Sequence, residues 1–87
     1  TDCLVSIIMT AFNSSRYIIS SIRSILNSDY QNIELIVIDD GSLDNTWELI
    51  TKIAKEDTRV RKIRLAQNKG TYFAKNIGLK YAKGEFV

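Results

Sequence analysis

Two adjacent carboxylates, Asp39 and Asp40, follow directly after the apolar run 35–38, and a glycine and a serine come next. Like charges beside a buried strand cost stability, so the pair is a candidate for binding chemistry. Carboxylates can hold a metal ion, or accept hydrogen bonds from ribose hydroxyls or from a base N–H group such as that of uracil. The alternative is structural: one aspartate caps the following turn, and Gly41 supplies a positive φ.

The composition excludes several other kinds of site. The 87 residues contain no histidine and one cysteine, Cys3, which excludes an internal disulfide framework and argues against a zinc site or a histidine-based triad. No apolar run approaches the roughly 18 residues of a membrane-spanning helix. We therefore expect a cytoplasmic protein that is one small soluble domain or a piece of a larger one.

Charge is distributed unevenly along the chain. Residues 1–44 hold two arginines against six acids, whereas residues 45–87 hold ten Lys or Arg against four acids. A basic half can meet phosphates or an anionic membrane surface, although lysines on solvated helix faces give the same count. No basic stripe interleaves with aromatic residues, so we expect no nucleic-acid partner.

The apolar residues alternate between strand and helix patterns. Continuous runs at 4–9 and 33–38 are typical of parallel strands buried on both faces, and the basic–apolar alternation at 62–65 suits an edge strand. Apolar residues at helical spacing follow each run, with Trp47 among the expected core residues. The inward face expected for the last helix is Ala74, Ile77, Gly78 and Tyr81. The candidate N-caps are Ser14 or Ser15, Asp44 or Asn45, and Thr71, and Gly84 is expected to end the last helix.

This order of elements predicts an α/β fold, a three-layer α/β/α Rossmann-like parallel sheet in which residues 85–87 open a fourth strand. Ligands of such sheets bind outside the carboxyl ends of the strands. Polar segments lie at those ends, at 10–15, 39–46 and 67–71. The sequence therefore predicts that the aspartate pair lies at a ligand-binding edge.

Two familiar nucleotide motifs are absent. The first turn contains no G-x-G-x-x-G, and no G-x-x-x-x-G-K-[ST] occurs, which excludes a dinucleotide site and a P-loop of those types. A receiver domain also places paired acids after a strand, but it needs a further aspartate at the end of a later strand, and the third strand leads into Ala66, Gln67 and Asn68. A noncatalytic or receiver-like regulatory module stays open as the alternative function.

Three segments, residues 5–26, 32–46 and 68–87, resemble in order and spacing the opening of family 2 glycosyltransferases with the GT-A fold. The resemblance implies that residues 1–87 are the N-terminal nucleotide-sugar-binding portion of such a domain, with strand order 3-2-1 and a stub of strand 4. The implied reaction moves a sugar from a nucleotide-sugar donor, expected to be a UDP-sugar, to a hydroxyl of a saccharide or lipid-linked acceptor in polysaccharide or glycolipid synthesis.

The resemblance also implies roles for individual residues. Thr10 and Ala11 would line the nucleoside pocket through their backbone. Phe12 stands where the family usually has tyrosine, so it can stack on the base without a hydroxyl contact. Asp40 would accept a hydrogen bond from the base, and Asp39 would brace the loop or reach the ribose.

The remaining implied nucleotide-binding residues are Asn13, Asn68, Gly70 and Lys75. Asn68 and Gly70 match a turn beside the base, where a missing side chain lets the nucleotide approach. Lys75 stands where arginine is commoner, so a point charge replaces a planar fork. Asn76 and Gly78 are expected to pack the last helix onto the sheet, and Tyr72 lies in the core or at the rim.

The family's metal-binding acidic motif follows the fourth strand. The resemblance therefore implies Mn or Mg in the full-length enzyme, with its ligands and the catalytic residues beyond Val87, and an inactive segment in isolation. The edge of the first strand, residues 4–10, would lack most of its partner and is expected to allow dimerisation. A lipid-linked acceptor would place the full-length protein at the inner face of a membrane.

Overall fold

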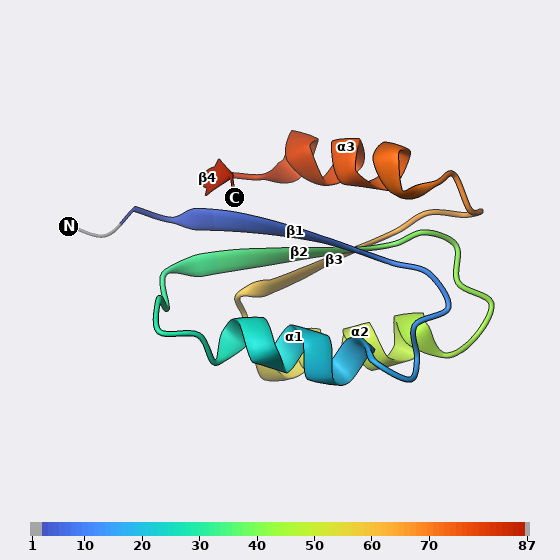
Figure 1. The fold of residues 1–87 in the computed structure, drawn as a ribbon, viewed down its shortest axis with the longest axis horizontal. Coiled ribbons are helices and arrows are strands. Elements are labelled where there is room, and N and C mark those ends of the chain that lie inside the picture. Colours follow the sequence, from blue (N-terminus) through green and yellow to red (C-terminus); the bar gives the residue numbers. More distant parts are fainter. Residues whose placement is uncertain (1–2, 87) are drawn as a thin grey trace.

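A parallel sheet separates one layer of two helices from a second layer with one helix (Figure 1). The computed structural model describes residues 3–86. Its elements are β1 (Val5–Ala11), α1 (Ile18–Leu26), β2 (Ile33–Asp39), α2 (Thr46–Glu56), β3 (Val60–Arg64), α3 (Thr71–Tyr81) and β4 (Glu85–Phe86). The strands run parallel in the order β3-β2-β1-β4. This order confirms the predicted fold class, with β3 at one edge; Val87 lies outside the described residues.

The register brings the carboxyl ends of three strands together. Ala11 pairs with Asp39 across β1 and β2, and Asp39 pairs with Arg64 across β2 and β3. All seven residues of β2 are buried, as the continuous apolar run predicts for a central strand. The loops that follow the three strands consequently leave the sheet at the same edge.

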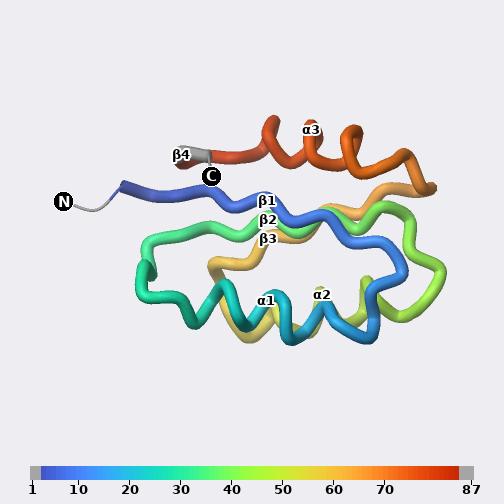
Figure 2. The backbone as a smooth tube through the Cα atoms, viewed as in Figure 1, coloured from blue at the N-terminus to red at the C-terminus, as the bar shows by residue number. Residues whose placement is uncertain are grey.

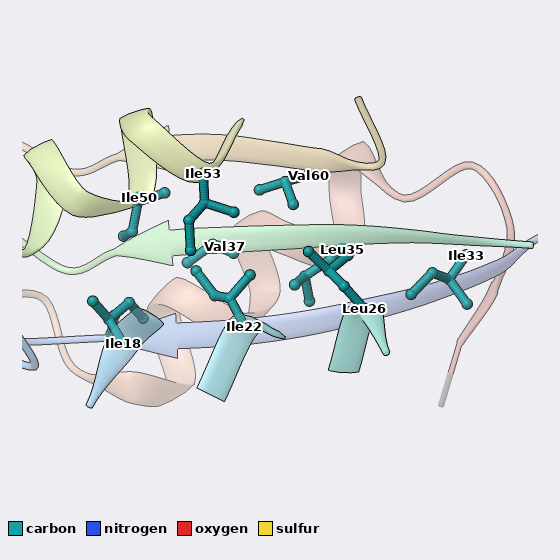
Figure 3. Packing of buried hydrophobic residues seen from close by; sticks show 10 residues of the cluster. Ile18, Ile22, Leu26, Ile33, Leu35, Val37, Ile50, Ile53 and Val60 are labelled. Carbon is teal, nitrogen blue, oxygen red and sulfur yellow. The ribbon is translucent and has the colours of Figure 1, made fainter. Parts of the chain in front are cut away.

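The larger core lies between β2 and the helix pair α1 and α2 (Figure 3). Ile22, Leu35 and Ile50 are fully buried there. A smaller cluster under α3 contains Ile36, Ile38 and Ala74, and Gly78 lets the helix approach closely, because a Cβ at this position would lie 2.7 Å from Ile8. The prediction that Gly78 packs the helix onto the sheet is confirmed, whereas Asn76 is exposed.

The expected helix caps were partly wrong. α1 follows Tyr17, and Ser14 contributes its backbone oxygen, which accepts from the N–H groups of Tyr17 and Ile18. Asn45 does occupy the N-cap of α2, but its side chain makes no capping bond. Instead the carboxylate of Asp44 accepts from the N–H of the first helical residue at 3.0 Å.

The ends of α3 also differ from expectation. The helix begins at Thr71 with Gly70 in the cap position at φ 93°, so Thr71 is the first helical residue and not its cap. It ends at Tyr81, three residues before Gly84, and Tyr81 is exposed instead of facing inward. Trp47 is only half-buried, because its ring lies beneath Lys62 and Arg64 at the sheet edge, at 4.8 and 5.5 Å from the ring centroid, and not in the core.

Among residues 3–86, no helix combines the length and apolar character needed to cross a membrane.

Candidate functional site

Three loops meet at the carboxyl edge of the sheet, where the tube in Figure 2 turns back after β1, β2 and β3. Residues 12–17 connect β1 to α1, residues 40–45 connect β2 to α2, and residues 65–70 connect β3 to α3. Every residue that the sequence assigned to a nucleotide site lies on these loops or beside them.

Hydrogen bonds join the first two loops directly. Asn13 donates its N–H to the hydroxyl of Ser42 at 2.9 Å and accepts from the N–H of Leu43 at 2.8 Å. Ser14 donates its N–H to the Thr46 hydroxyl at 2.8 Å. Asn13 adopts φ 49°, a left-handed conformation that asparagine tolerates well. Its side chain therefore serves the contact between loops, a role that the sequence did not indicate.

Asp44 reinforces the same contact. Its carboxylate accepts from the hydroxyl and the N–H of Thr46, and from the N–H of Ser15 at 3.3 Å. These donors, above all the Thr46 hydroxyl, lower the pKa of Asp44 from 3.8 to about 2. Sequence reasoning treated Asp44 only as a possible helix cap, because its partner in the first loop is distant in the chain.

Asp40 ties the third loop to the end of β2. Its side chain is 3% exposed, and its Oδ1 accepts from the N–H of Lys69 at 2.7 Å. Oδ2 accepts from the N–H of Gly70 at 2.9 Å and from the Asn68 amide at 3.1 Å. The backbone N–H of Asp40 donates to the oxygen of Ala11 at 2.8 Å. This one residue is thus bonded to the end of β1 and to the loop that follows β3.

Asp39 points to the opposite face of the sheet, because successive side chains of a strand alternate. Its Oδ1 accepts from the N–H of Ser42 at 3.0 Å, which braces the second loop. Its Oδ2 is buried without a hydrogen bond and lies 3.7 Å from Nε of Arg64. The two adjacent carboxylates therefore belong to separate hydrogen-bond networks on opposite faces of the sheet.

Gly41 brings the second and third loops into contact. It adopts φ 73°, and a Cβ there would lie 2.5 Å from the backbone carbon of Gln67. Both the conformation and the spacing therefore require glycine. Outside this contact lies a hollow of about 420 Å³. Its lining residues are Gly41, Ser42, Leu43, Arg64, Leu65 and Ala66.

The other candidate residues lie at the same edge. Phe12 is 44% exposed, whereas Thr10 is half-buried and Ala11 is 4% exposed. Lys75 is exposed in the second turn of α3. The edge thus offers an exposed aromatic ring, a backbone-lined strand end and a cation, which suits a flat base carrying phosphates.

Residues 3–86 contain no group of three or more His, Cys, Asp or Glu side chains that could hold a metal ion. The prediction that metal ligands follow Val87 stays a prediction.

The known proteins to which this chain is similar include several glycosyltransferases. The WfaP protein of Escherichia coli, a UDP-Glc:alpha-D-GlcNAc-diphosphoundecaprenol beta-1,3-glucosyltransferase, is 43% identical over 97% of this chain and 33% of its own length. Staphylococcus aureus TarS 1-349, solved in complex with UDP, superposes with a TM-score of 0.82 at 30% identity, over 95% of this chain and 26% of TarS.

A third likeness concerns the fold alone. The mannosyltransferase PcManGT from Pyrobaculum calidifontis, solved in complex with GDP-Man and Mn2+, has a TM-score of 0.85 at 24% identity, over 92% of this chain and 24% of PcManGT. The chain spans 34%, 28% and 33% of the length of three curated relatives it matches, and 12% of a fourth. The profile of glycosyl transferase family 2 matches residues 6–87, and the chain belongs to this family.

Proposed function

We propose that this chain is the donor-binding portion of a glycosyltransferase that uses a UDP-sugar and glycosylates an acceptor hydroxyl in polysaccharide or glycolipid synthesis. The observation that carries the proposal is the set of three loops hydrogen-bonded to one another at the carboxyl edge, with Phe12 exposed among them. A site fixed before the ligand arrives loses little conformational entropy on binding.

The relatives support uridine as the base. TarS matches 95% of the length of this chain and was solved with UDP, and the name of WfaP specifies UDP-Glc. The lipid-linked sugar in the name of WfaP likewise supports a lipid-linked acceptor for the full-length protein.

The ring of Phe12 would stack on the uracil while the backbone of Thr10 and Ala11 lines the pocket. Stacking requires only a flat apolar face, so phenylalanine serves as well as tyrosine for this contact. The turn at Asn68 and Gly70 closes the other side. Lys75 would meet phosphate oxygens as a point charge.

Asp40 has two roles in this proposal. Its carboxylate holds the 68–70 turn through its bonds to Lys69, Gly70 and Asn68. Two carboxylate oxygens offer about four acceptor positions, so Oδ1, which accepts from Lys69, has one left for a base N–H. Asp39 contributes indirectly, by holding the backbone of Ser42.

The chemical step needs groups outside this chain. A departing nucleoside diphosphate must be neutralised, which a divalent Mn or Mg ion can do, and the acceptor hydroxyl must lose a proton to a base. The described residues supply no metal cluster, so no step of the transfer is assigned to them. We expect residues 1–87 to bind the nucleotide and to be inactive alone.

The edge of β1 is the predicted dimerisation surface of the isolated chain. β4 pairs only with Val5 and Ser6, so most of residues 4–10 has no neighbour strand on that side within the described part of the chain. Sedimentation at high concentration tests this prediction, and a monomer would contradict it.

Calorimetric titration of UDP, GDP and ADP into the chain, with and without manganese, tests the proposed function. We expect UDP-selective binding that manganese leaves unchanged. Phe12→Ala should weaken it about fivefold or more, because base stacking contributes about 1–3 kcal/mol. Phe73→Ala is the matched control, since Phe73 on α3 is 45% exposed and Phe12 is 44% exposed.

Equal binding of the three nucleotides, or equal losses in the two phenylalanine variants, would contradict the assigned base pocket. If the folded chain binds no nucleotide and the longer encoded protein binds none either, the noncatalytic alternative would be favoured.

A further inference from the structure

The outer surface of α3 is basic and contains no acid. Residues 69–84 include four lysines and neither Asp nor Glu. All four lysines, Lys69, Lys75, Lys80 and Lys83, are exposed. The positive charge of this segment is therefore uncompensated by its own sequence.

Apolar side chains lie between these lysines on the solvent side of the helix. Ala74 and Gly78 are the buried residues of α3 and mark its inner side. Tyr72 is 82% exposed and Leu79 is 36% exposed. At about 100° per residue, positions seven apart fall on one stripe, and this stripe lies on the exposed side of the helix, about 130° around it from Ala74 and Gly78.

Lys75 lies on one side of this stripe, and the exposed Asn76 and then Lys80 lie on the other, by helical spacing. We define the α3 outer face as Tyr72, Asn76, Leu79 and Lys80, without Lys75, which the proposed function places at the nucleotide phosphates. Apolar side chains beside cations on the exposed side of a helix are found in helices that lie in a membrane interface. Tyrosine favours that interface, and lysines can reach phosphate groups while their methylenes stay near the acyl region.

The helix pair on the opposite face of the sheet has a different surface. On α2, the exposed Lys52 and Lys55 share the helix with Glu48 and Glu56. Arg23 of α1 pairs with Glu56 at 3.6 Å. The exposed lysines of α2 are thus accompanied by acidic residues on the same helix, whereas the lysines of residues 69–84 are not.

We propose that the α3 outer face contacts an anionic lipid surface. Charge complementarity selects this occupant, because Lys80 on this face and the exposed Lys69 and Lys83 at the two ends of the helix attract acidic headgroups, each by a factor of about five in affinity. The inference deepens the proposed function, since an enzyme with a lipid-linked acceptor must work at a bilayer.

The test is cosedimentation of the full-length protein with vesicles of phosphatidylcholine alone or mixed with phosphatidylglycerol. We expect binding to the mixed vesicles only, weakening as salt is raised. Lys80→Ala with Lys83→Ala should reduce the partition coefficient about 25-fold. Lys52→Ala with Lys55→Ala removes the same charge from α2 and should change it less than about twofold.

Leu79→Ser separates membrane contact from general attraction to polyanions. It keeps every charge and should still weaken vesicle binding severalfold, while binding to polyglutamate stays the same. Equal losses in the two lysine pairs, an unchanged Leu79→Ser, or binding to polyglutamate without binding to vesicles would overturn the proposal. Circular dichroism of each variant controls for folding.

UDP titration of the same proteins keeps the two proposals distinguishable, because none of the substituted residues belongs to the proposed nucleotide site. UDP binding without vesicle binding overturns only the membrane contact. Vesicle binding without UDP binding supports the membrane contact and overturns the proposed nucleotide site.

Discussion

The two ends of α3 are held to β2 by two carboxylates of different character. Glu34 and Asp40 are six residues apart, so both point to the face that α3 covers. Asp40 accepts N–H groups just before the helix, and Glu34 accepts the N–H of Lys83 just after it. Six strand residues span about 20 Å and eleven helical residues about 16 Å, so the two carboxylates bracket the helix.

Glu34 forms a closed, charge-neutral cluster. Its Oε1 lies 2.8 Å from Arg61, and its Oε2 accepts from the hydroxyl of Ser6. Ser6 in turn accepts from the N–H of Gly84 at 2.8 Å, and Arg61 donates to the backbone oxygen of Tyr81 at 2.7 Å. Every partner serves to fix the start of β4 against the sheet.

Asp40 is held without a cation. No ion pair within residues 3–86 includes it, and its donors are two backbone N–H groups and one side-chain amide. Its negative charge lies near the positive end of the α3 dipole and is not cancelled by a side chain. The Glu34 end of α3 is thus neutralised by Arg61, whereas the acid at the proposed site has no cation beside it in the described part of the chain.

Removing Glu34 is the most severe way to break this arrangement. Glu34→Ala leaves Ser6, Arg61 and the N–H of Lys83 without their acceptor, and we expect a loss of about 3 kcal/mol in the free energy of unfolding. Arg61 is 34% exposed and can regain water, which keeps the loss from being larger. Urea denaturation at neutral pH measures it. A loss below that of Asp40→Asn would reverse the proposed ranking of the two ends.

Acid should weaken the Glu34 end through the same cluster. Burial raises the pKa of Glu34, but hydrogen bonds from Ser6 and Lys83, together with Arg61, outweigh it and lower the pKa from 4.5 to about 2. Because the folded pKa is the lower one, this stabilisation is complete above about pH 4.5 and is lost as pH falls toward 2.

Thermal melts of Glu34→Gln should therefore depend less on pH between about 4.5 and 2 than those of the unmodified chain. Some dependence should remain, because the pKa values of Asp44 and Asp57 are also lowered by their hydrogen-bond donors. If the melting temperatures of the two proteins fall equally with pH over that range, Glu34 is not the titrating group.

The sequence predicted the strands and helices better than the hydrogen bonds between the loops that connect them. Continuous apolar runs identify β1 and β2, because a strand buried on both faces needs them. The N-cap of α1 could not be predicted from the local sequence. Ser14 donates its N–H to the hydroxyl of Thr46, and its own hydroxyl donates to the backbone oxygen of Phe12 instead of capping the helix. The adjacency of Asp39 and Asp40 suggested one shared site, although strand alternation separates them across the sheet.

Asp40→Asn alters the carboxylate at the other end of α3. An amide keeps one acceptor oxygen but places an NH2 group against a backbone N–H, so we expect a loss of about 2 kcal/mol in the free energy of unfolding. UDP affinity should fall more than tenfold, because the turn at 68–70 shifts and the base acceptor is lost. Glu34→Gln is the control, and its folded form should bind UDP normally. Similar UDP affinities for both variants would remove Asp40 from the site.

The glycines at the two ends of α3 give the clearest contrast between stability and binding. Gly70 has φ 93° and ψ 154°, a region that glycine alone adopts readily, and a Cβ there would meet nothing within 4 Å, so Gly70→Ala should cost only conformational strain, about 1–3 kcal/mol. At Gly84 a Cβ would lie 2.3 Å from the backbone oxygen of Leu4, so Gly84→Ala must displace the chain and should cost about 2–3 kcal/mol.

Urea denaturation of both glycine variants measures these two costs, and UDP titration separates their consequences. Gly70 donates its N–H to Asp40 beside the proposed base pocket, so Gly70→Ala should be the substitution that weakens UDP binding. Gly84 belongs to the closed cluster at the far end, and its substitution should destabilise the chain while the folded fraction binds UDP unchanged. If Gly84→Ala weakened UDP binding and Gly70→Ala did not, the two ends of α3 would not have separate roles in stability and in binding.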